Sequence, residues 1–421
     1  MRRFFRPSFR RPLPLFFVPM CRDSPKRSEA RLRCRAIQAG TVPRRDGRDN
    51  GGHVSSSLEC LFVSGRQGSF TPLFSDFGPL LFKRIFMDYN NLGSAGVKVS
   101  PLCLGTMMFG GQTSEADSTR IIYKALDLGI NFIDTADMYN AGESEVVVGK
   151  AIADRRDDFV LATKGRNAMA EGPNHGGGSR LHMTRAVDAS LKRLGTDFID
   201  LYYFHAPDYE TPIEETLRAM DDMVTSGKVR YLACSNFRSW RLMEALWTAD
   251  ALSLHRFVCL QPLYNIVNRD IEVEVLPACE EYDLGVVSYS PLARGILTGK
   301  YKPGESFPEG SRASRNDPRM QQAELREASI EISQQIVKHA EAKGTTASRF
   351  SLAWCLANPT LTSIIVGPKT MEQFEDNVQC LDVEITPDDE DFIDSLVPPG
   401  EHSGKGHQDS AYPITGRGLS L

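Results

Sequence analysis

The chain has 421 residues, of which 41% are hydrophobic and 24% are charged, so it can build one large barrel or two ordinary globular domains. Its net charge of −5 is unevenly distributed. Residues 1–86 contain 15 Arg and 2 Lys against 6 acidic residues, whereas the remainder contains 32 basic and 48 acidic residues. An acidic body argues against nucleic acid as the partner, and no apolar run reaches the roughly 18–20 residues of a membrane span.

Residues 1–86 show no sustained hydrophobic period and mix Arg with Pro, Gly-Gly and a Ser triplet. Such a segment predicts no fold of its own. Three interpretations stay open: a disordered extension, an Arg-rich organelle transit peptide, or upstream sequence before a true start at Met87. We therefore expect the folded domain to span residues 87–421.

The nine cysteines are scattered, with no Cys-x-x-Cys pair and no spacing typical of metal ligands. This pattern predicts reduced thiols in a reducing compartment and implies no metal. We therefore expect a cytoplasmic protein, with organelle targeting by residues 1–86 as the alternative.

Beyond Met87, short β-branched apolar runs alternate with amphipathic stretches. Amphipathic spacing predicts helices such as 116–128, which ends before Gly129, and 211–226, which opens with Thr-Pro and ends before Gly227. The eight predicted strands are residues 99–105, 131–135, 159–163, 199–204, 229–234, 258–261, 286–290 and 363–366.

Eight strands alternating with helices indicate a parallel sheet covered by helices, and about 335 residues favour closure into a single (β/α)₈ TIM barrel of the α/β class. The alternative is an open doubly wound sheet that binds a dinucleotide. That fold would require Gly-x-Gly-x-x-Gly after its first strand, and the sequence contains no such motif. The barrel is therefore the preferred prediction.

In such a barrel the chemistry lies where the strands end. Most of the residues at these ends are polar, and they recur about every 30 residues: Asp134, Lys164, His205, Ser235, Asn236, Gln261, Tyr289 and Gly367. Asp134 is the natural partner for the ammonium of Lys164, because they end adjacent predicted strands. Tyr139 lies on the loop above Asp134, where the nearby lysine is expected to lower the pKa of the phenol and suit it to proton transfer.

These residues lie in motifs that resemble the aldo-keto reductase family from about Tyr89 to about residue 415. The motifs are G-I-N-F-I-D-T-A-D-M-Y, V-L-A-T-K, S-L-K-R-L-G-T-D-F-I-D-L-Y-Y-F-H, C-S-N-F, L-Q-P-L-Y-N, Y-S-P-L-A-R-G-I-L-T-G-K-Y and I-I-V-G-P-K. The resemblance implies hydride transfer between NADP(H) and a carbonyl or alcohol substrate. Tyr139 would be the general acid, Lys164 and Asp134 would tune it, and His205 would orient the carbonyl.

The same resemblance implies a dinucleotide site, to which Asp134 would also belong. Ser235, Asn236 and Gln261 would hold the nicotinamide carboxamide, and Tyr289 would stack on the ring. The pyrophosphate would lie along Ser290, Leu292, Arg294 and Lys300, under a mobile belt of residues 302–318 in which Arg312 binds phosphate. The adenosine end would meet Gly367, Lys369, Gln373, Asp376 and Asn377. Many members carry Arg where this chain has Gln373, so NAD(H) is possible beside NADP(H).

The substrate side is expected to involve residues that follow three of the strands: Met107, Met108, Phe109, Arg166, Asn167 and Asp208. Whether the barrel associates with itself is not specified by these patterns.

Two other functions use the same residues. The motifs S-P-L-A-R-G-I-L-T-G-K-Y and S-R-A-S also resemble the β subunits of voltage-gated potassium channels, which would make the chain a cofactor-binding regulatory partner. Those subunits carry Asn where this chain has His205, and the histidine favours a reductase. A Schiff-base aldolase would use Lys164 as its nucleophile, but such a lysine must be neutral, and an ion-paired Lys164 stays charged.

Overall fold

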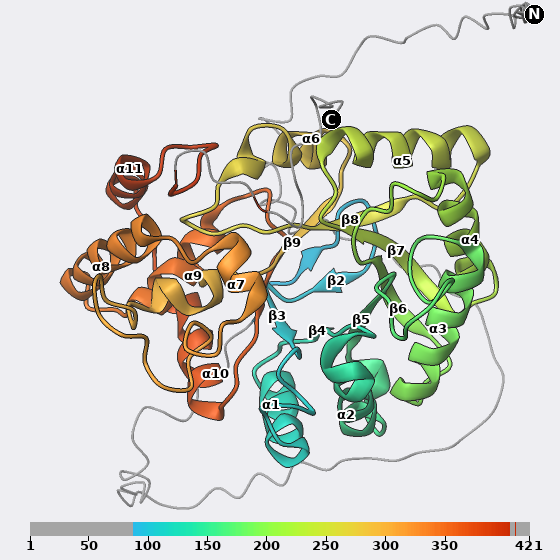
Figure 1. Cartoon of the computed structure of the whole chain (residues 1–421), viewed down its shortest axis with the longest axis horizontal. Coiled ribbons are helices and arrows are strands. Elements are labelled where there is room, and N and C mark those ends of the chain that lie inside the picture. The colour runs from blue at the N-terminus through green and yellow to red at the C-terminus, as the bar shows by residue number, and fades with distance from the viewer. Residues whose placement is uncertain (1–86, 405–408, 410–421) are drawn as a thin grey trace, which may run out of the picture. The chain divides into compact units, whose positions relative to one another are not determined.

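A closed barrel of eight parallel strands forms the centre of the chain (Figure 1). The computed structural model describes residues 87–404 and residue 409, so the expectations for residues 1–86 lie outside the described residues. β10 pairs with β3, which closes the barrel and confirms the predicted (β/α)₈ architecture. The strands are β3 (Leu102–Gly105), β4 (Phe132–Asp134), β5 (Val160–Gly165), β6 (Ile199–Phe204), β7 (Val229–Ser235), β8 (Phe257–Gln261), β9 (Gly285–Ser288) and β10 (Ser363–Val366).

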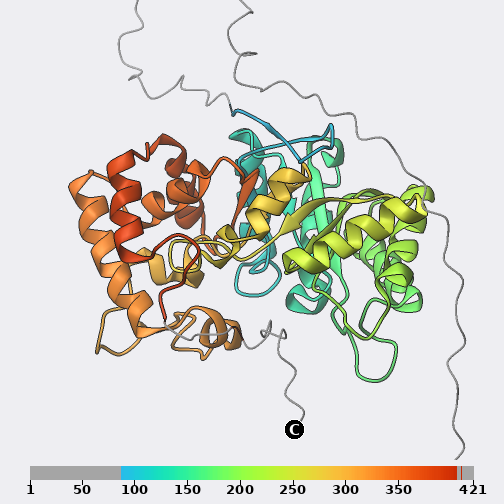
Figure 2. The same ribbon diagram turned by 90° about the horizontal axis from the view of Figure 1, so that it is seen from above.

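Helices surround the strands (Figure 1), with α8–α11 gathered on one side of the barrel and α3–α5 on the other (Figure 2). Within the described residues, no helix has the length and apolar character needed to cross a membrane. The helices are α1 (Glu115–Asp127), α2 (Glu143–Ile152), α3 (Arg180–Leu194), α4 (Ile213–Thr225), α5 (Ser239–Leu252), α6 (Val275–Glu281), α7 (Pro318–Ala323), α8 (Glu327–Ala342), α9 (Ala347–Ala357), α10 (Met371–Val378) and α11 (Pro387–Leu396).

The ends of the elements follow local chemistry. α1 begins one residue before the predicted helix 116–128, because the side chain of Ser114 caps it by accepting the backbone N–H of Asp117. The predicted strand 99–105 is wrong in its first half. Pro101 has no N–H for the ladder, so only Leu102–Gly105 joins the barrel.

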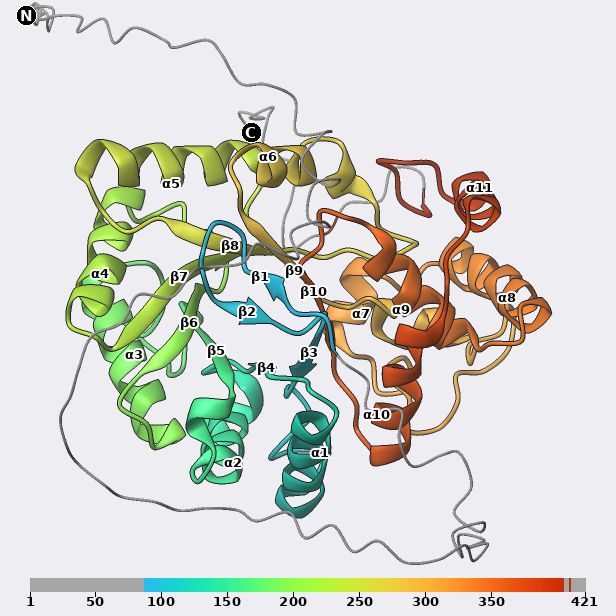
Figure 3. The ribbon, with the colours of Figure 1, turned by 180° about the vertical axis from the view of Figure 1, so that it is seen from behind.

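The residues before Pro101 form a separate antiparallel hairpin, in which β1 (Asn90–Asn91) pairs with β2 (Lys98–Val99). Figure 3 shows this hairpin lying across the barrel. Leu92 and Val99 are fully buried and pack against the barrel interior. Gly93 has a φ of +58°, and a β-carbon there would lie 2.3 Å from the backbone nitrogen of Gly285, so only glycine fits this close approach. The hairpin thus fills the end of the barrel at which the strands begin.

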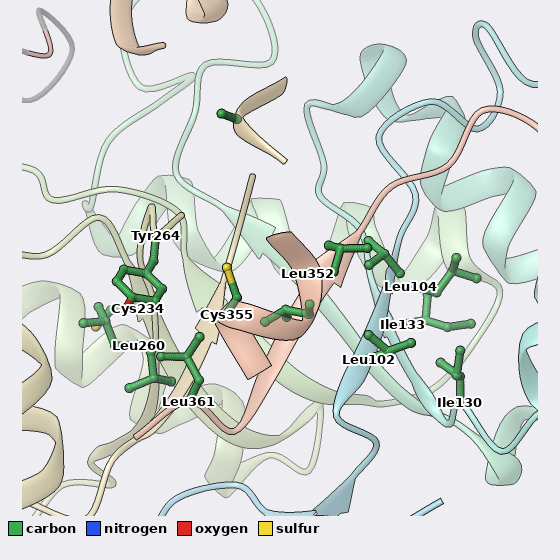
Figure 4. Close-up of a cluster of buried hydrophobic side chains, with 14 of the residues drawn as sticks. Leu102, Leu104, Ile130, Ile133, Cys234, Leu260, Tyr264, Leu352, Cys355 and Leu361 are labelled. Atoms are coloured by element: carbon green, nitrogen blue, oxygen red, sulfur yellow. The ribbon is translucent and has the colours of Figure 1, made fainter. Parts of the chain in front are cut away.

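Alternate residues of each strand serve two cores, because successive side chains in a strand point to opposite faces. One set, which includes Cys103, Phe132 and Tyr203, fills the barrel interior. The other set packs between the strands and the helices, and includes Leu102, Leu104 and Ile133 of the strands and Leu352 of α9 (Figure 4). A strand that is buried on both faces is a continuous apolar run in the sequence. The first polar residue after such a run therefore marks the end of the strand.

Candidate functional site

The predicted strand-end residues gather around one cavity of about 820 Å³. Asp134 ends β4, Ser235 ends β7 and Gln261 ends β8, while His205 follows β6 and Gly367 follows β10. All five line the cavity. Parallel strands that close into a barrel bring their carboxyl ends to one rim, so residues far apart in sequence become neighbours here.

Lys164 lies beneath the cavity floor with no solvent exposure and forms an ion pair with Asp134. Its Nζ also donates to the carbonyl oxygen of Thr135 at 2.8 Å and to the hydroxyl of Tyr139 at 3.2 Å. The second carboxylate oxygen of Asp134 accepts from Nε2 of Gln261 at 2.9 Å. The ion pair expected between the ends of adjacent strands is therefore present, and a neighbouring strand end buttresses it.

This arrangement keeps Lys164 charged. Burial by itself would lower the pKa of the ammonium, but the adjacent Asp134 and Tyr139 more than offset that effect, and the pKa is raised. A lysine held in this form is a hydrogen-bond donor and not a free amine nucleophile.

The phenol of Tyr139 differs from its predicted behaviour. Burial raises its pKa above the ordinary value of 10, and the opposing effect of Lys164 is insufficient, partly because Asp134 adds a negative charge nearby. The expectation that Lys164 lowers the pKa of this phenol below its reference is therefore wrong for the net shift. Tyr139 stays protonated across the physiological range and can act as a proton donor.

A short 3₁₀ turn, Tyr139–Gly142, holds the phenol over the lysine. Asn140 has a φ of +48°, which asparagine tolerates better than most residues. Its amide donates to the carbonyl oxygens of Met107 at 3.1 Å and Phe109 at 2.7 Å. The loop that carries Tyr139 is thus fastened to the loop that follows β3.

His205 lines the cavity beside Tyr139, with ring centroids 6.1 Å apart and nearly perpendicular planes. Burial lowers its pKa well below 6.5, and the nearby cations Lys164 and Arg166 lower it further. The imidazole is therefore neutral at physiological pH and can donate a hydrogen bond through only one of its two nitrogens.

A polar network forms one wall of the cavity. Ser235 donates from its hydroxyl to the carbonyl oxygen of Gln261 at 2.8 Å. The amide of Asn236 donates to the Ser235 hydroxyl at 2.9 Å and to the carbonyl oxygen of His205 at 3.1 Å. The phenol of Tyr289 donates to Oδ1 of Asn236 at 2.7 Å. These side chains hold one another in place across four strand ends.

Basic side chains collect at the other end of the cavity. Lys300, Arg312 and Lys369 line it, and Arg315 lies close enough to affect the ionisation of the two lysines. Burial and the neighbouring cations lower the pKa of Lys300, and the same two causes lower the pKa of Lys369. Among the described residues, neither lysine has a carboxylate within ion-pair distance. Mutual repulsion of this kind favours binding of an anion.

Some of the polar residues at this end already have partners within the protein. Arg312 pairs with Asp317 at 3.0 Å, and Asp376 pairs with Arg349 at 2.7 Å. Arg294 lies 2.8 Å from the fully buried carboxylate of Glu324. These contacts order the side chains, whereas Lys300 and Lys369 have no carboxylate partner in the described part of the chain.

The structure brings together every predicted dinucleotide residue. Ser290, Leu292, Gln373 and Asn377 line the same cavity as those described above, as do residues 308–312 of the predicted belt. Gln373 uses its amide oxygen to accept the backbone N–H of Lys369 at 2.9 Å.

The predicted substrate residues divide into two groups. Met107, Met108 and Asn167 line the cavity. Phe109, Arg166 and Asp208 are not among the residues that line it. Phe109 is fully buried in the core, Arg166 donates to the carbonyl oxygen of Pro207 at 3.1 Å, and Asp208 accepts the backbone N–H of Gly178 at 2.6 Å.

Other lining residues were not predicted from the sequence. They include Met138, Ala206, Arg319, Ser348 and Leu352. Met138 directly precedes Tyr139, so its position next to a predicted catalytic residue was a signal that it could line the cavity. Ser348 and Leu352 lie on α9, and their spacing of four residues signals only a helical face, which gives no sign that the face borders a cavity.

A closed (β/α)₈ barrel with a proton donor, a neutral histidine and a cationic cleft at its carboxyl rim has the organisation of a barrel enzyme. The sequence model of the Aldo/keto reductase family matches residues 101–398. The chain is 39% identical over 326 residues to an uncharacterized oxidoreductase of Bacillus subtilis, an alignment that covers 75% of this chain and 97% of that protein. The chain belongs to the aldo/keto reductase family and, by that membership, is of oxidoreductase type.

The chain is also similar to proteins named as potassium channel subunits. It is 37% identical over 303 residues to a probable voltage-gated potassium channel subunit beta of Arabidopsis thaliana, covering 70% of this chain and 92% of that protein. It is 38% identical over 317 residues to a putative voltage-gated potassium channel subunit beta of Schizosaccharomyces pombe, covering 73% and 89% respectively.

Proposed function

We propose that the protein is an NADP(H)-dependent oxidoreductase that interconverts an aldehyde or ketone and the corresponding alcohol. The observation that carries the proposal is a single cavity with two chemically different ends. One end holds a half-buried, protonated phenol above an ion-paired lysine. The other holds Lys300 and Lys369, for which the described part of the chain supplies no counter-ion. A ligand that spans the cavity therefore needs a reactive group at one end and a polyanion at the other.

The described residues fit a nicotinamide dinucleotide phosphate. Lys300 and Arg312 are suited to its pyrophosphate, and Lys369 to a 2′-phosphate at the adenosine end. The hydroxyl of Ser235 and the amides of Asn236 and Gln261 suit the nicotinamide carboxamide, and the ring of Tyr289 offers a surface for stacking. When bound, the reduced cofactor supplies a hydride to the carbonyl carbon.

The protein's own groups handle the proton. Tyr139 donates its hydroxyl proton to the carbonyl oxygen as negative charge develops there, which completes the alcohol. Lys164 donates a hydrogen bond to the phenolic oxygen at 3.2 Å and stabilises the phenolate that forms. Asp134 keeps that lysine charged, and His205 donates a hydrogen bond to the same carbonyl oxygen. Water then returns a proton to Tyr139, and alcohol oxidation uses these groups in reverse.

The preference for NADP(H) over NAD(H) rests on Lys369. Its neighbours Arg312 and Arg315 are also basic, so a phosphate dianion bound there would relieve their repulsion. Gln373 contributes no charge at this position, which leaves Lys369 as the main determinant.

The remaining expectations are also part of this proposal. The partner is a small carbonyl or alcohol compound, and the compartment is the cytoplasm. The six cysteines in the described part of the chain are free and buried, which suits a reducing environment.

A second candidate is a cofactor-binding regulatory partner of a membrane channel, and the similarity to proteins named as channel subunits favours it. The two candidates predict different results in one experiment. The purified full chain is mixed with NADPH or NADH and a panel of aldehydes, quinones, keto-steroids and sugars, and loss of NADPH absorbance is followed. We expect oxidation that requires a carbonyl compound and is faster with NADPH. Tight NADPH binding without carbonyl-dependent oxidation across the panel would reject the reductase and favour the regulatory partner.

A further inference from the structure

Asn167 is the hydrogen-bond partner of His205. It lies two residues beyond the end of β5, and its Nδ2 lies 3.1 Å from Nδ1 of the imidazole. Because the ring is neutral, only one of its nitrogens carries a hydrogen. The identity of the Asn167 atom that faces Nδ1 therefore decides which nitrogen of His205 is the donor.

The surroundings of Asn167 select one orientation of its amide. Nδ2 also lies 2.8 Å from the sulfur of Met138, which is a weak acceptor. Oδ1 faces Nη1 of Arg166 at 3.5 Å, on a guanidinium that is always charged. A flipped amide would place its oxygen against the sulfur and its NH₂ group against the guanidinium. Both contacts would be unfavourable, so the amide presents a donor to the ring.

The backbone before Asn167 is held in an uncommon conformation. Arg166 has a backbone φ of +133°, which residues other than glycine rarely adopt. Its carbonyl oxygen accepts the N–H of Gly177 at 2.8 Å, and the carbonyl of Gly165 accepts the N–H of His205 at 3.0 Å. The guanidinium of Arg166 donates to the carbonyl oxygen of Pro207, two residues beyond His205. Asn167 and His205 are thus held against each other by contacts on both loops.

We propose that Asn167 is a positioning residue that fixes His205 in the tautomer with hydrogen on Nε2. Nδ1 then accepts from Asn167, and Nε2–H faces the cavity as a donor to the carbonyl oxygen of the substrate. With the opposite tautomer, Nε2 would be an acceptor and would repel that oxygen. The role of Nε2–H as a donor to substrate rests on the proposed carbonyl chemistry. The tautomer itself is a property of the protein without substrate and can be measured independently.

The first test measures the tautomer directly. The full chain is labelled with ¹⁵N-histidine, and the ring nitrogens are followed by NMR between pH 6 and 8 (a range in which histidines ordinarily titrate), with His205→Gln identifying the signal. We expect a neutral ring with hydrogen on Nε2. In Asn167→Ala we expect both tautomers, because the selecting donor is gone. A ring with hydrogen on Nδ1, or an unchanged tautomer in Asn167→Ala, would overturn the proposal whether or not the protein reduces carbonyls.

The second test uses Asn167→Asp, which replaces the donor with an acceptor of nearly the same shape. The carboxylate should raise the pKa of His205 and favour hydrogen on Nδ1. Activity should then fall as pH rises through that new pKa, because the ring loses its Nε2 hydrogen. Asn174→Asp is the matched control, since Asn174 is exposed on the same loop and receives the same charge. It should keep the pH profile of the unmodified chain.

The kinetic pattern separates positioning from general damage. In Asn167→Ala we expect kcat to fall about two- to tenfold, equivalent to one neutral hydrogen bond, with NADPH affinity unchanged. Asn167→Gln keeps the amide donor and should recover part of the lost rate. The same pH profile in Asn167→Asp and Asn174→Asp would contradict the proposal.

Discussion

Substitution of Tyr139 by Phe removes one hydroxyl from the centre of the site. That hydroxyl accepts a hydrogen bond from Lys164 at 3.2 Å. The ammonium keeps its ion pair with Asp134 and its bond to the carbonyl oxygen of Thr135, so the buried charge remains paired. The aromatic ring can still lie over Nζ, which is 4.9 Å from its centroid. The variant should therefore fold and bind NADPH much as the unmodified chain does.

The reaction, in contrast, loses its proton donor. General acid catalysis contributes about 10²- to 10⁴-fold, so kcat should fall by that factor, equivalent to roughly 3–5 kcal/mol in the activation barrier. The rate is measured from NADPH absorbance at saturating cofactor, and NADPH affinity from quenching of protein fluorescence. A large fall in kcat with little change in affinity is the expected result.

Tyr202→Phe is a matched control, because it removes the same hydroxyl group from a tyrosine that does not line the cavity. Tyr202 is fully buried, does not line the cavity, and its hydroxyl has no hydrogen-bond partner among the described residues. Its loss should leave kcat unchanged and not reduce stability. Full carbonyl reductase activity in Tyr139→Phe would refute the assignment of Tyr139 as the acid. An equal loss in Tyr202→Phe would show that the measured effect is not specific to the site.

Four further changes test other features of the protein: Lys164→Met, Lys369→Met, Asp137→Asn and a chain that begins at Met87. Lys164→Met leaves Asp134 buried and unpaired, so kcat should fall at least as far as in Tyr139→Phe, with a lower melting temperature; covalent trapping of substrate on Lys164 by borohydride in the unmodified chain would instead indicate an aldolase. Lys369→Met should weaken NADPH binding about ten- to hundredfold in titrations and spare NADH, and an equal loss for both would place the lysine elsewhere. Burial, and then the nearby Glu145, raise the pKa of Asp137 to about 7. The folded state therefore holds this proton more tightly than the unfolded state, and the cost of that carboxyl grows as pH rises from about 4 to about 7. Asp137→Asn should remove this dependence and stabilise the protein above pH 7 by at most about 4 kcal/mol in denaturant unfolding, and unchanged pH dependence would contradict it. The chain that begins at Met87 should match the full chain in melting temperature and turnover, and a large loss of either would assign a structural role to residues 1–86.

Much of the site could be predicted because its positions follow from the fold. Lys164, His205 and Gln261 each end an apolar run, and parallel strands in a closed barrel place such residues at one rim. The barrel itself follows from the alternation of apolar runs and amphipathic stretches. These features depend on hydrophobic periodicity and on the order of the elements along the chain, and the sequence shows both directly.

Local sequence patterns were thus enough to predict the barrel and the residues that meet at its rim, whereas the ionisation and orientation of those residues depend on tertiary packing. The pKa of Tyr139 depends on how completely its neighbours exclude water, and that burial outweighs the adjacent Lys164. Phe109 turns into the core although Met108 lines the cavity. The amide of Asn167 is oriented by Arg166 and Met138, which surround it only after the loops pack. Desolvation and side-chain direction arise from contacts between distant segments, and no local pattern encodes them.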